Sequence, residues 1–148
     1  MNIYAIIILA TIVIEFILSI YSEVLNLKKL DPKLPKEFDG FYDDEKYKKS
    51  QDYTRVNTKF GFLTSGFSLI ITLVFWFAGG FNYLDQLVRG WGLHSIWTGL
   101  LYIGILTFLN TAISLPFSIY STFVIEEKFG FNKTTVKTFI LDMVKVTL

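Results

Sequence analysis

The side chains that usually carry metal or acid–base chemistry are sparse in this chain. It has 148 residues, no cysteine and one histidine, His94. A zinc site needs about three or four protein ligands, often with two histidines at i, i+4 on one helix. Neither such a pair nor a set of thiolates can be assembled here. The sequence therefore predicts no catalytic residue, no metal ligand and no cofactor in this chain, and we assign His94 no chemistry.

One dense group of charged and polar residues follows a long apolar segment, and we call residues 121–133 the elbow. Its candidate functional residues are Glu126, Glu127, Lys128, Gly130, Phe131 and Asn132. The three charges end the apolar run, the glycine permits a left-handed helix stop, and the asparagine can cap a new helix. We interpret the six residues as supporting or interdomain contacts. A helix terminus that satisfies its own polar groups is the simpler alternative.

The composition places these residues among membrane elements. Hydrophobic residues make up 52% of the chain and aromatic residues 18%. Fourteen basic and thirteen acidic residues nearly cancel, so no broad basic face indicates nucleic acid as a partner. We predict an all-α membrane protein, with three transmembrane helices, a cytoplasmic helical connector and a C-terminal amphipathic helix. Its first partner is the lipid bilayer.

Three apolar runs are long enough to cross a bilayer as helices. We place these spans at about residues 3–21, 60–77 and 96–119. The first run has no basic segment before it and no small-residue cleavage site after it. We therefore read it as an uncleaved span rather than a signal peptide.

The remaining segments connect or follow the spans. Residues 28–59 form a polar connector that reads as a helix from about Asp43, and residues 82–95 form a short connector. Residues 134–148 repeat apolar side chains at helical spacing, which predicts an amphipathic helix. We expect residues 1–148 to form a single membrane domain.

Each span also carries a stripe of polar residues. Glu15 is the one ionisable residue deep in a span, and helical spacing aligns it with Thr11 and Ser19. A carboxylate at that depth is costly against lipid, so we expect it to face protein or water. Asn110 belongs to the most polar stripe, on the third span. The stripes pack together or line a water-filled chamber; for Glu15 we favour a structural hydrogen bond over a direct role in chemistry.

The distribution of basic residues predicts the orientation in the membrane. Nine lie between the first and second spans, one between the second and third, and four after the third. By the positive-inside rule, the N-terminus is outside, while the connector 28–59 and the C-terminus are cytoplasmic.

Two stretches of the sequence are similar to a known family. The elbow sequence Phe-Val-Ile-Glu-Glu-Lys-Phe-Gly-Phe-Asn-Lys-Thr-Thr resembles the signature of the type I CAAX prenyl endopeptidases, which are membrane-embedded zinc metalloproteases. Upstream, Tyr47, Ser50 and Tyr53 look like the family's Tyr/Phe-x-x-Ser-x-x-Tyr segment, which leads into its second span. With the pattern of spans, the resemblance covers essentially the whole chain and is closest to bacterial members.

The resemblance implies a function that this chain does not complete alone. The family cuts peptides with a His-Glu-x-x-His helix and a later glutamate on zinc, and this chain has neither histidine pair nor metal site. We therefore expect the N-terminal membrane domain of such an enzyme, which forms a chamber wall and a docking surface. The implied partners are the catalytic metalloprotease portion and a peptide or protein substrate. Zinc is expected in the complete enzyme, and the location is the bacterial cytoplasmic membrane.

A different class of function stays open. The chain is alternatively a non-catalytic membrane scaffold or partner subunit, in which the polar stripes serve oligomerisation.

Overall fold

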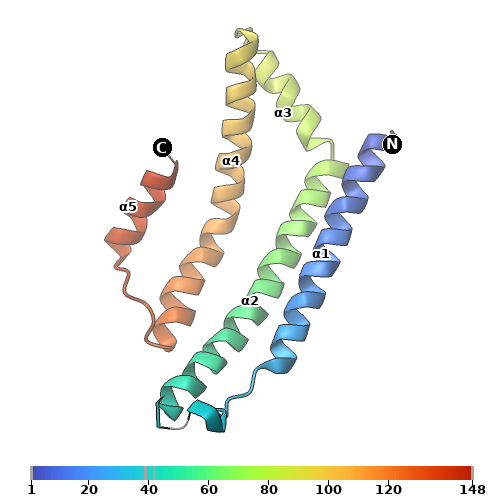
Figure 1. The fold of residues 1–148 in the computed structure, drawn as a ribbon. Helices are drawn as coiled ribbons and strands as arrows, with labels where there is room; N and C mark the ends of the chain where they lie inside the picture. Colours follow the sequence, from blue (N-terminus) through green and yellow to red (C-terminus); the bar gives the residue numbers. More distant parts are fainter. Residues whose placement is uncertain (1, 39, 42, 148) are drawn as a thin grey trace. The chain divides into compact units, whose positions relative to one another are not determined.

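The structure is a computed structural model that describes residues 2–38, 40, 41 and 43–147. All regular secondary structure in these ranges is helical, which confirms the predicted fold class (Figure 1). The elements in chain order are α1 (Ile3–Lys29), the 3-10 turn η1 (Lys36–Phe38), α2 (Asp44–Phe77), α3 (Gly80–Arg89), α4 (Ser95–Tyr120), the π-helical turn η2 (Ser121–Glu126) and α5 (Val136–Thr147).

The chain divides into two compact units, and each is described by itself. The first unit comprises Met1–Leu30 and Thr58–Pro116, and the second comprises Asp31–Asn57 and Phe117–Leu148. The first unit holds α1, α3 and most of α4. The second holds η1, the beginning of α2, the elbow and α5.

Three stretches of helix within the described ranges are long and apolar enough to span a membrane: Ile3–Lys29, Asp44–Phe77 and Ser95–Glu126. The first has 27 residues, or about 40 Å of helix, against a hydrocarbon core of about 30 Å. No described residue of α1 or α2 is buried. Large apolar side chains such as Leu18 and Ile70 are about 60% exposed. This surface suits lipid tails, and the chain is an integral membrane protein.

The helix α2 joins two segments that the sequence reading separates. The predicted connector 28–59 and the predicted span 60–77 meet inside one uninterrupted helix, Asp44–Phe77. The start is set by Asp43, whose carboxylate accepts hydrogen bonds from the backbone of Glu45 at 2.9 Å and Lys46 at 3.1 Å. No proline interrupts the segment that follows, so the change from polar to apolar side chains does not end the helix.

The predicted connector 82–95 contains a helix that the sequence analysis did not anticipate, because α3 occupies Gly80–Arg89. Leu84 and Val88, four residues apart, form one face of α3 and are buried. Arg89 donates a hydrogen bond to Asp85 at 2.7 Å, and this partner raises the pKa of Arg89 above its ordinary value. The helix is short and its buried apolar face has only two side chains. Its polar residues therefore made it difficult to recognise as a helix from the sequence.

Candidate docking site at the elbow

The helix of the third candidate span is closed by a Schellman motif. The backbone N–H of Gly130 donates to the carbonyl of Glu127, and that of Phe131 donates to the carbonyl of Glu126, both at 2.9 Å. Gly130 has φ of 62°, the left-handed conformation in which glycine has no Cβ penalty. The left-handed stop expected at Gly130 is therefore present, and the chain reverses there.

A π-helical turn, which the sequence reading missed, leads into this motif. It comprises Ser121–Glu126, and its Ile125 is 4% exposed. A π-helical turn closes i to i+5 bonds, which shifts the following side chains relative to an α-helical register. A pattern search with a period of 3.6 residues cannot detect such a shift. Turns of this kind are frequent at functional sites.

Asn132 closes the elbow differently from the predicted helix cap. Its side-chain oxygen accepts from the backbone of Thr134 at 2.7 Å, and its amide donates to the Glu127 carboxylate at 3.0 Å. The first forms a local turn, so α5 begins later, and Thr135 caps it by accepting from the backbone of Thr138 at 3.2 Å. The prediction that Asn132 caps the helix is wrong, because a two-residue turn of its own uses that oxygen.

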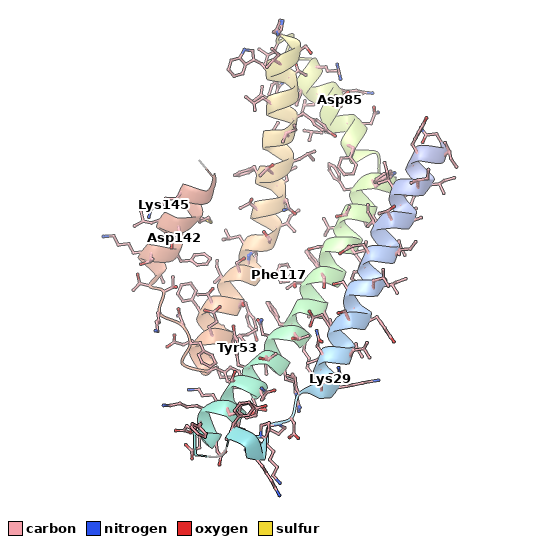
Figure 2. The ribbon with its side chains drawn as sticks, viewed as in Figure 1. Lys29, Tyr53, Asp85, Phe117, Asp142 and Lys145 are labelled. Carbon is pink, nitrogen blue, oxygen red and sulfur yellow. The ribbon has the colours of Figure 1, made fainter. Side chains whose placement is uncertain are left out.

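Aromatic contacts connect the elbow to the beginning of α2, within the second unit. We call Lys49, Tyr53, Phe129 and Phe131 the elbow cluster. The Tyr53 ring makes edge contacts with Phe129 and Phe131, with ring centroids 5.6 Å and 4.8 Å apart. The ammonium of Lys49 lies 5.8 Å from the centre of the Phe131 ring. Figure 2 shows Tyr53 on α2.

Each of these contacts contributes a modest energy, and the two ring contacts both involve Tyr53. An edge-to-face pair of aromatic rings contributes about 0.5–1.5 kcal/mol beyond the area that it buries. Lys49 and Tyr53 are four residues apart and share one face of α2, so a ring and a cation meet the elbow together. Phe129 and Phe131 flank Gly130, so the left-handed turn between them lets two rings reach one tyrosine.

The cluster unites parts of the two sequence stretches that carry the family resemblance. Tyr53 belongs to the upstream stretch, and Phe131 to the elbow. Tyr47 and Ser50 enter the described contacts through their backbones: Tyr47 donates to the carbonyl of Asp43 at 2.9 Å, and Ser50 accepts from the Thr54 hydroxyl at 3.0 Å.

The sequence reading missed two members of the cluster. It singled out neither Lys49 nor Phe129. The signal available was the i, i+4 spacing from Lys49 to Tyr53 and the two phenylalanines on either side of Gly130.

Three charged residues of the elbow, Glu126, Glu127 and Lys128, lie in different surroundings. Glu127 is exposed but holds Asn132, as described above. Lys128 is exposed, and its ammonium lies 5.8 Å from the centre of the Phe129 ring. Glu126 is half-buried and contributes its carbonyl to the Schellman motif.

The intramembrane polar candidates lie in the first unit. Glu15 is exposed on α1 and lines a hollow of about 450 Å³ with Thr11, Ser19 and neighbouring apolar residues. The Thr11 hydroxyl donates a hydrogen bond to the carbonyl of Ile7 at 2.9 Å. Asn110 is exposed on α4. Thr11, Glu15 and Ser19 thus line the same hollow, and the roles expected for Glu15 and Asn110 stay predictions.

Zinc does not fit the residues present. Within the ranges that the structure describes, no group of three or more His, Cys, Asp or Glu side chains could hold a metal ion. His94 lies just before α4, where its carbonyl accepts hydrogen bonds from the backbone at 3.1 Å and the hydroxyl at 3.3 Å of the buried Thr98.

Replacing Gly130 tests the elbow geometry. We expect Gly130→Val to lower the free energy of unfolding by about 1–2 kcal/mol or more, because a side chain with a Cβ resists positive φ and a β-branched one resists it most. The added Cβ would also lie 3.3 Å from the Lys49 ammonium nitrogen. Thermal unfolding of the purified protein in detergent measures the change.

Two variants separate this effect from a general loss. Gly130→Asn should cost clearly less, because asparagine tolerates the left-handed region. Gly104→Ala, inside α4, should not destabilise, because the added Cβ would have no atom within 4 Å other than the adjoining residues and the backbone of its own helix. A Gly130→Val protein as stable as the parent would contradict the left-handed stop.

Known proteins match this chain along most of its length. A family model described as CAAX prenyl protease N-terminal, five membrane helices, matches residues 23–148. CAAX prenyl protease 1 of Saccharomyces cerevisiae is 35% identical over 143 residues, covering 88% of this chain and 31% of that protein. Probable CAAX prenyl protease 1 of Schizosaccharomyces pombe is 34% identical over 116 residues, covering 70% of this chain and 24% of that protein.

A solved structure gives the same relationship. The crystal structure of S. mikatae Ste24p is similar with a TM-score of 0.84 at 33% identity, covering 99% of this chain and 36% of that chain. This chain thus spans about a quarter to a third of the length of the relatives that it matches. The closer likeness to bacterial members stays a prediction. The family resemblance is confirmed: the chain belongs to the CAAX prenyl protease family and carries its N-terminal membrane region.

Proposed function

We propose that this chain is the N-terminal membrane domain of a CAAX prenyl protease-type zinc metalloendopeptidase, which cuts peptide bonds at the membrane. The observation that carries the proposal is the match of 99% of this helical chain to 36% of a solved family member. The chain supplies part of a chamber wall and a docking surface for the catalytic portion. It is not catalytic alone, since its described residues offer no metal site.

The elbow cluster supports a docking role. Phe131 is 44% exposed although its ring contacts Tyr53. Gly130 and the Glu127–Asn132 hydrogen bond fix the backbone beside that ring. A partly exposed aromatic ring on a preorganised turn is suited to receive a partner surface, because little conformational freedom is lost on binding. We assign this surface to the catalytic portion of the enzyme.

The polar stripe on α1 supports a chamber wall. Glu15, Thr11 and Ser19 share a face and line one hollow. A carboxylate in that position is costly against lipid, and facing water or the rest of the protein removes the cost. In this proposal, Asn110 on α4 also contributes to the chamber wall. In the complete enzyme, zinc and the peptide or protein substrate come with the catalytic portion.

The orientation is part of the proposal. Nine basic residues lie between the spans predicted at residues 3–21 and 60–77, against one between the spans predicted at 60–77 and 96–119. This asymmetry favours a cytoplasmic connector and C-terminus and an outside N-terminus, in a bacterial cytoplasmic membrane.

Zinc dependence and one elbow variant test the function. We expect the full-length protein that carries this chain to contain zinc and to cleave a prenylated peptide, with cleavage lost on chelation and restored by zinc. Asn132→Ala removes the bond to Glu127 and should lower cleavage about tenfold through misplacement of the docked portion. Elemental analysis of zinc and a peptide-cleavage assay measure both quantities.

The control and the contradictory result are distinct. Lys137→Gln, on α5, should leave both cleavage and zinc content unchanged. Asn132→Ala should reduce cleavage without reducing zinc content, because zinc is held elsewhere. A full-length protein without zinc and without peptidase activity would support the alternative of a non-catalytic membrane scaffold or partner subunit.

Cysteine labelling tests the orientation, because this chain contains no cysteine of its own. Single cysteines at the exposed positions Lys46 and Asn82 mark the connector and the opposite side. In intact cells, a membrane-impermeant maleimide should label Asn82→Cys and not Lys46→Cys, and inverted vesicles should give the reverse. The same label on both positions in intact cells would contradict the proposed orientation.

A further inference from the structure

The helix α3 is packed against the end of α2, a candidate membrane span, within the first unit. Gly79 has φ of 75°, the left-handed conformation in which the chain turns out of α2. Phe81 then makes edge contacts with Phe75 and Trp76, with ring centroids 4.8 Å and 5.9 Å apart. A Cβ at Gly80 would lie 2.5 Å from the Phe75 ring, so glycine permits this close approach. The position of α3 relative to the end of this span is therefore fixed.

The other end of α3 leads directly into the next candidate span. α4 begins at Ser95, six residues after Arg89, and a fully extended chain limits this link to about 20 Å. The hydroxyl of the buried Thr98 donates to the carbonyls of Leu93 at 3.2 Å and His94 at 3.3 Å. The link is thus tied to the first turn of α4. Two candidate spans hold α3 from both ends, which keeps it close to the membrane surface (Figure 1).

The charges of α3 do not oppose contact with a membrane. In residues 60–125, Asp85 and Arg89 are the only Asp, Glu, Lys or Arg residues. They form an ion pair with each other at 2.7 Å. A pair of opposite charges costs less near hydrocarbon than two separate charges do. The segment between the two spans therefore carries no net charge from these four residue types.

The apolar face of α3 is wider than the part that the protein buries. Leu84 and Val88 are 6% and 0% exposed. Tyr83 and Leu87 precede them by one residue each, so they lie on the adjoining side of the helix, and they are 69% and 43% exposed. The opposite side is polar, with residues at i, i+4 and i+7: Asn82, Gln86 and Arg89. The exposed part of the apolar face is available to an apolar partner.

Exposed tryptophans follow α3 in the chain and indicate what that partner is. Trp91 is 52% exposed and Trp97 is 59% exposed, and Leu93 between them is 45% exposed. Tyrosine and tryptophan combine a large apolar ring with one hydrogen-bonding atom. Membrane proteins concentrate these two residue types at the boundary between lipid headgroups and acyl chains. Rings of this kind beside the ends of two candidate spans favour lipid as the partner.

We propose that α3 is an interfacial helix that rests on the bilayer surface. Tyr83 and Leu87 contact the boundary between headgroups and acyl chains, while Asn82 and Gln86 face water. In this position, α3 anchors the link between α2 and α4 at one depth. The inference depends on the membrane spans and is independent of peptide cleavage.

Spin labels on the two sides of α3 test the proposal. The full-length protein, with any cysteines outside this chain replaced, is reconstituted into vesicles of phosphatidylcholine and phosphatidylglycerol. The labelled variants are Tyr83→Cys, Leu87→Cys, Asn82→Cys and Gln86→Cys. Oxygen concentrates among acyl chains and a neutral nickel complex stays in water, so the ratio of their collision rates reports depth. We expect that ratio to be several-fold higher at Tyr83 and Leu87 than at Asn82 and Gln86.

Two results would overturn the interfacial helix. Equal access of the nickel complex to all four labels would mean that α3 lies in water. Low access of both reagents to the labels at Tyr83 and Leu87 would mean that protein, rather than lipid, covers this face. A label at the buried Leu84 supplies the reference for a position covered by protein.

A matched pair of charge variants tests whether the contact is one-sided. Leu87→Glu and Gln86→Glu each add one negative charge to neighbouring positions of α3. With the spin label at Tyr83, Leu87→Glu should lower the oxygen-to-nickel ratio several-fold, because a carboxylate is costly against acyl chains. Gln86→Glu should leave that ratio unchanged. An equal change in both variants, or a change in neither, would contradict contact of the Leu87 side with lipid.

Discussion

The contact of Tyr53 with the two phenylalanines beside Gly130 is the interaction on which this account of the elbow depends. Tyr53 meets Phe129 and Phe131, which follow it by 76 and 78 residues in the sequence. Both sequence stretches that resemble the family thus contribute a ring to this contact. The left-handed glycine makes the geometry possible, and the hydrogen bond from Asn132 to Glu127 holds the chain after the turn. These contacts hold the turn at Gly130, which follows the end of the candidate span Ser95–Glu126.

The rest of the chain gains little from burial in itself. In the described residues, Leu84, Val88, Ile125 and Thr98 are the buried ones. A soluble chain of this composition would need a larger core, whereas a membrane chain exposes its apolar side chains to lipid and satisfies backbone groups within helices. The elbow cluster is accordingly an aromatic feature near the ends of long helices.

The sequence predicted the helical class, the apolar runs and the glycine stop, because these follow from periodicity and from glycine's freedom at positive φ. It did not predict that α2 continues from the connector into the second candidate span, since hydropathy changes at Phe60 while helix propensity does not. It also missed α3, whose buried face is two residues, and the π-helical turn, which breaks the 3.6-residue period. The ring partners of Tyr53 lie far from it in the sequence, so the spacing of residues could not predict them. The roles of Glu15 and Asn110 stay predictions.

A double-mutant cycle between Tyr53 and Phe131 tests the central contact most directly. Tyr53→Leu, Phe131→Leu and the double variant are compared by their free energies of unfolding in detergent. We expect a coupling energy of about 1 kcal/mol between the two rings. The control pair, Tyr53 with Phe139, whose ring contacts Phe123 instead, should be additive within about 0.5 kcal/mol. Additive effects of Tyr53→Leu and Phe131→Leu would contradict the contact and, with it, the proposal that the elbow and α2 form one docking surface.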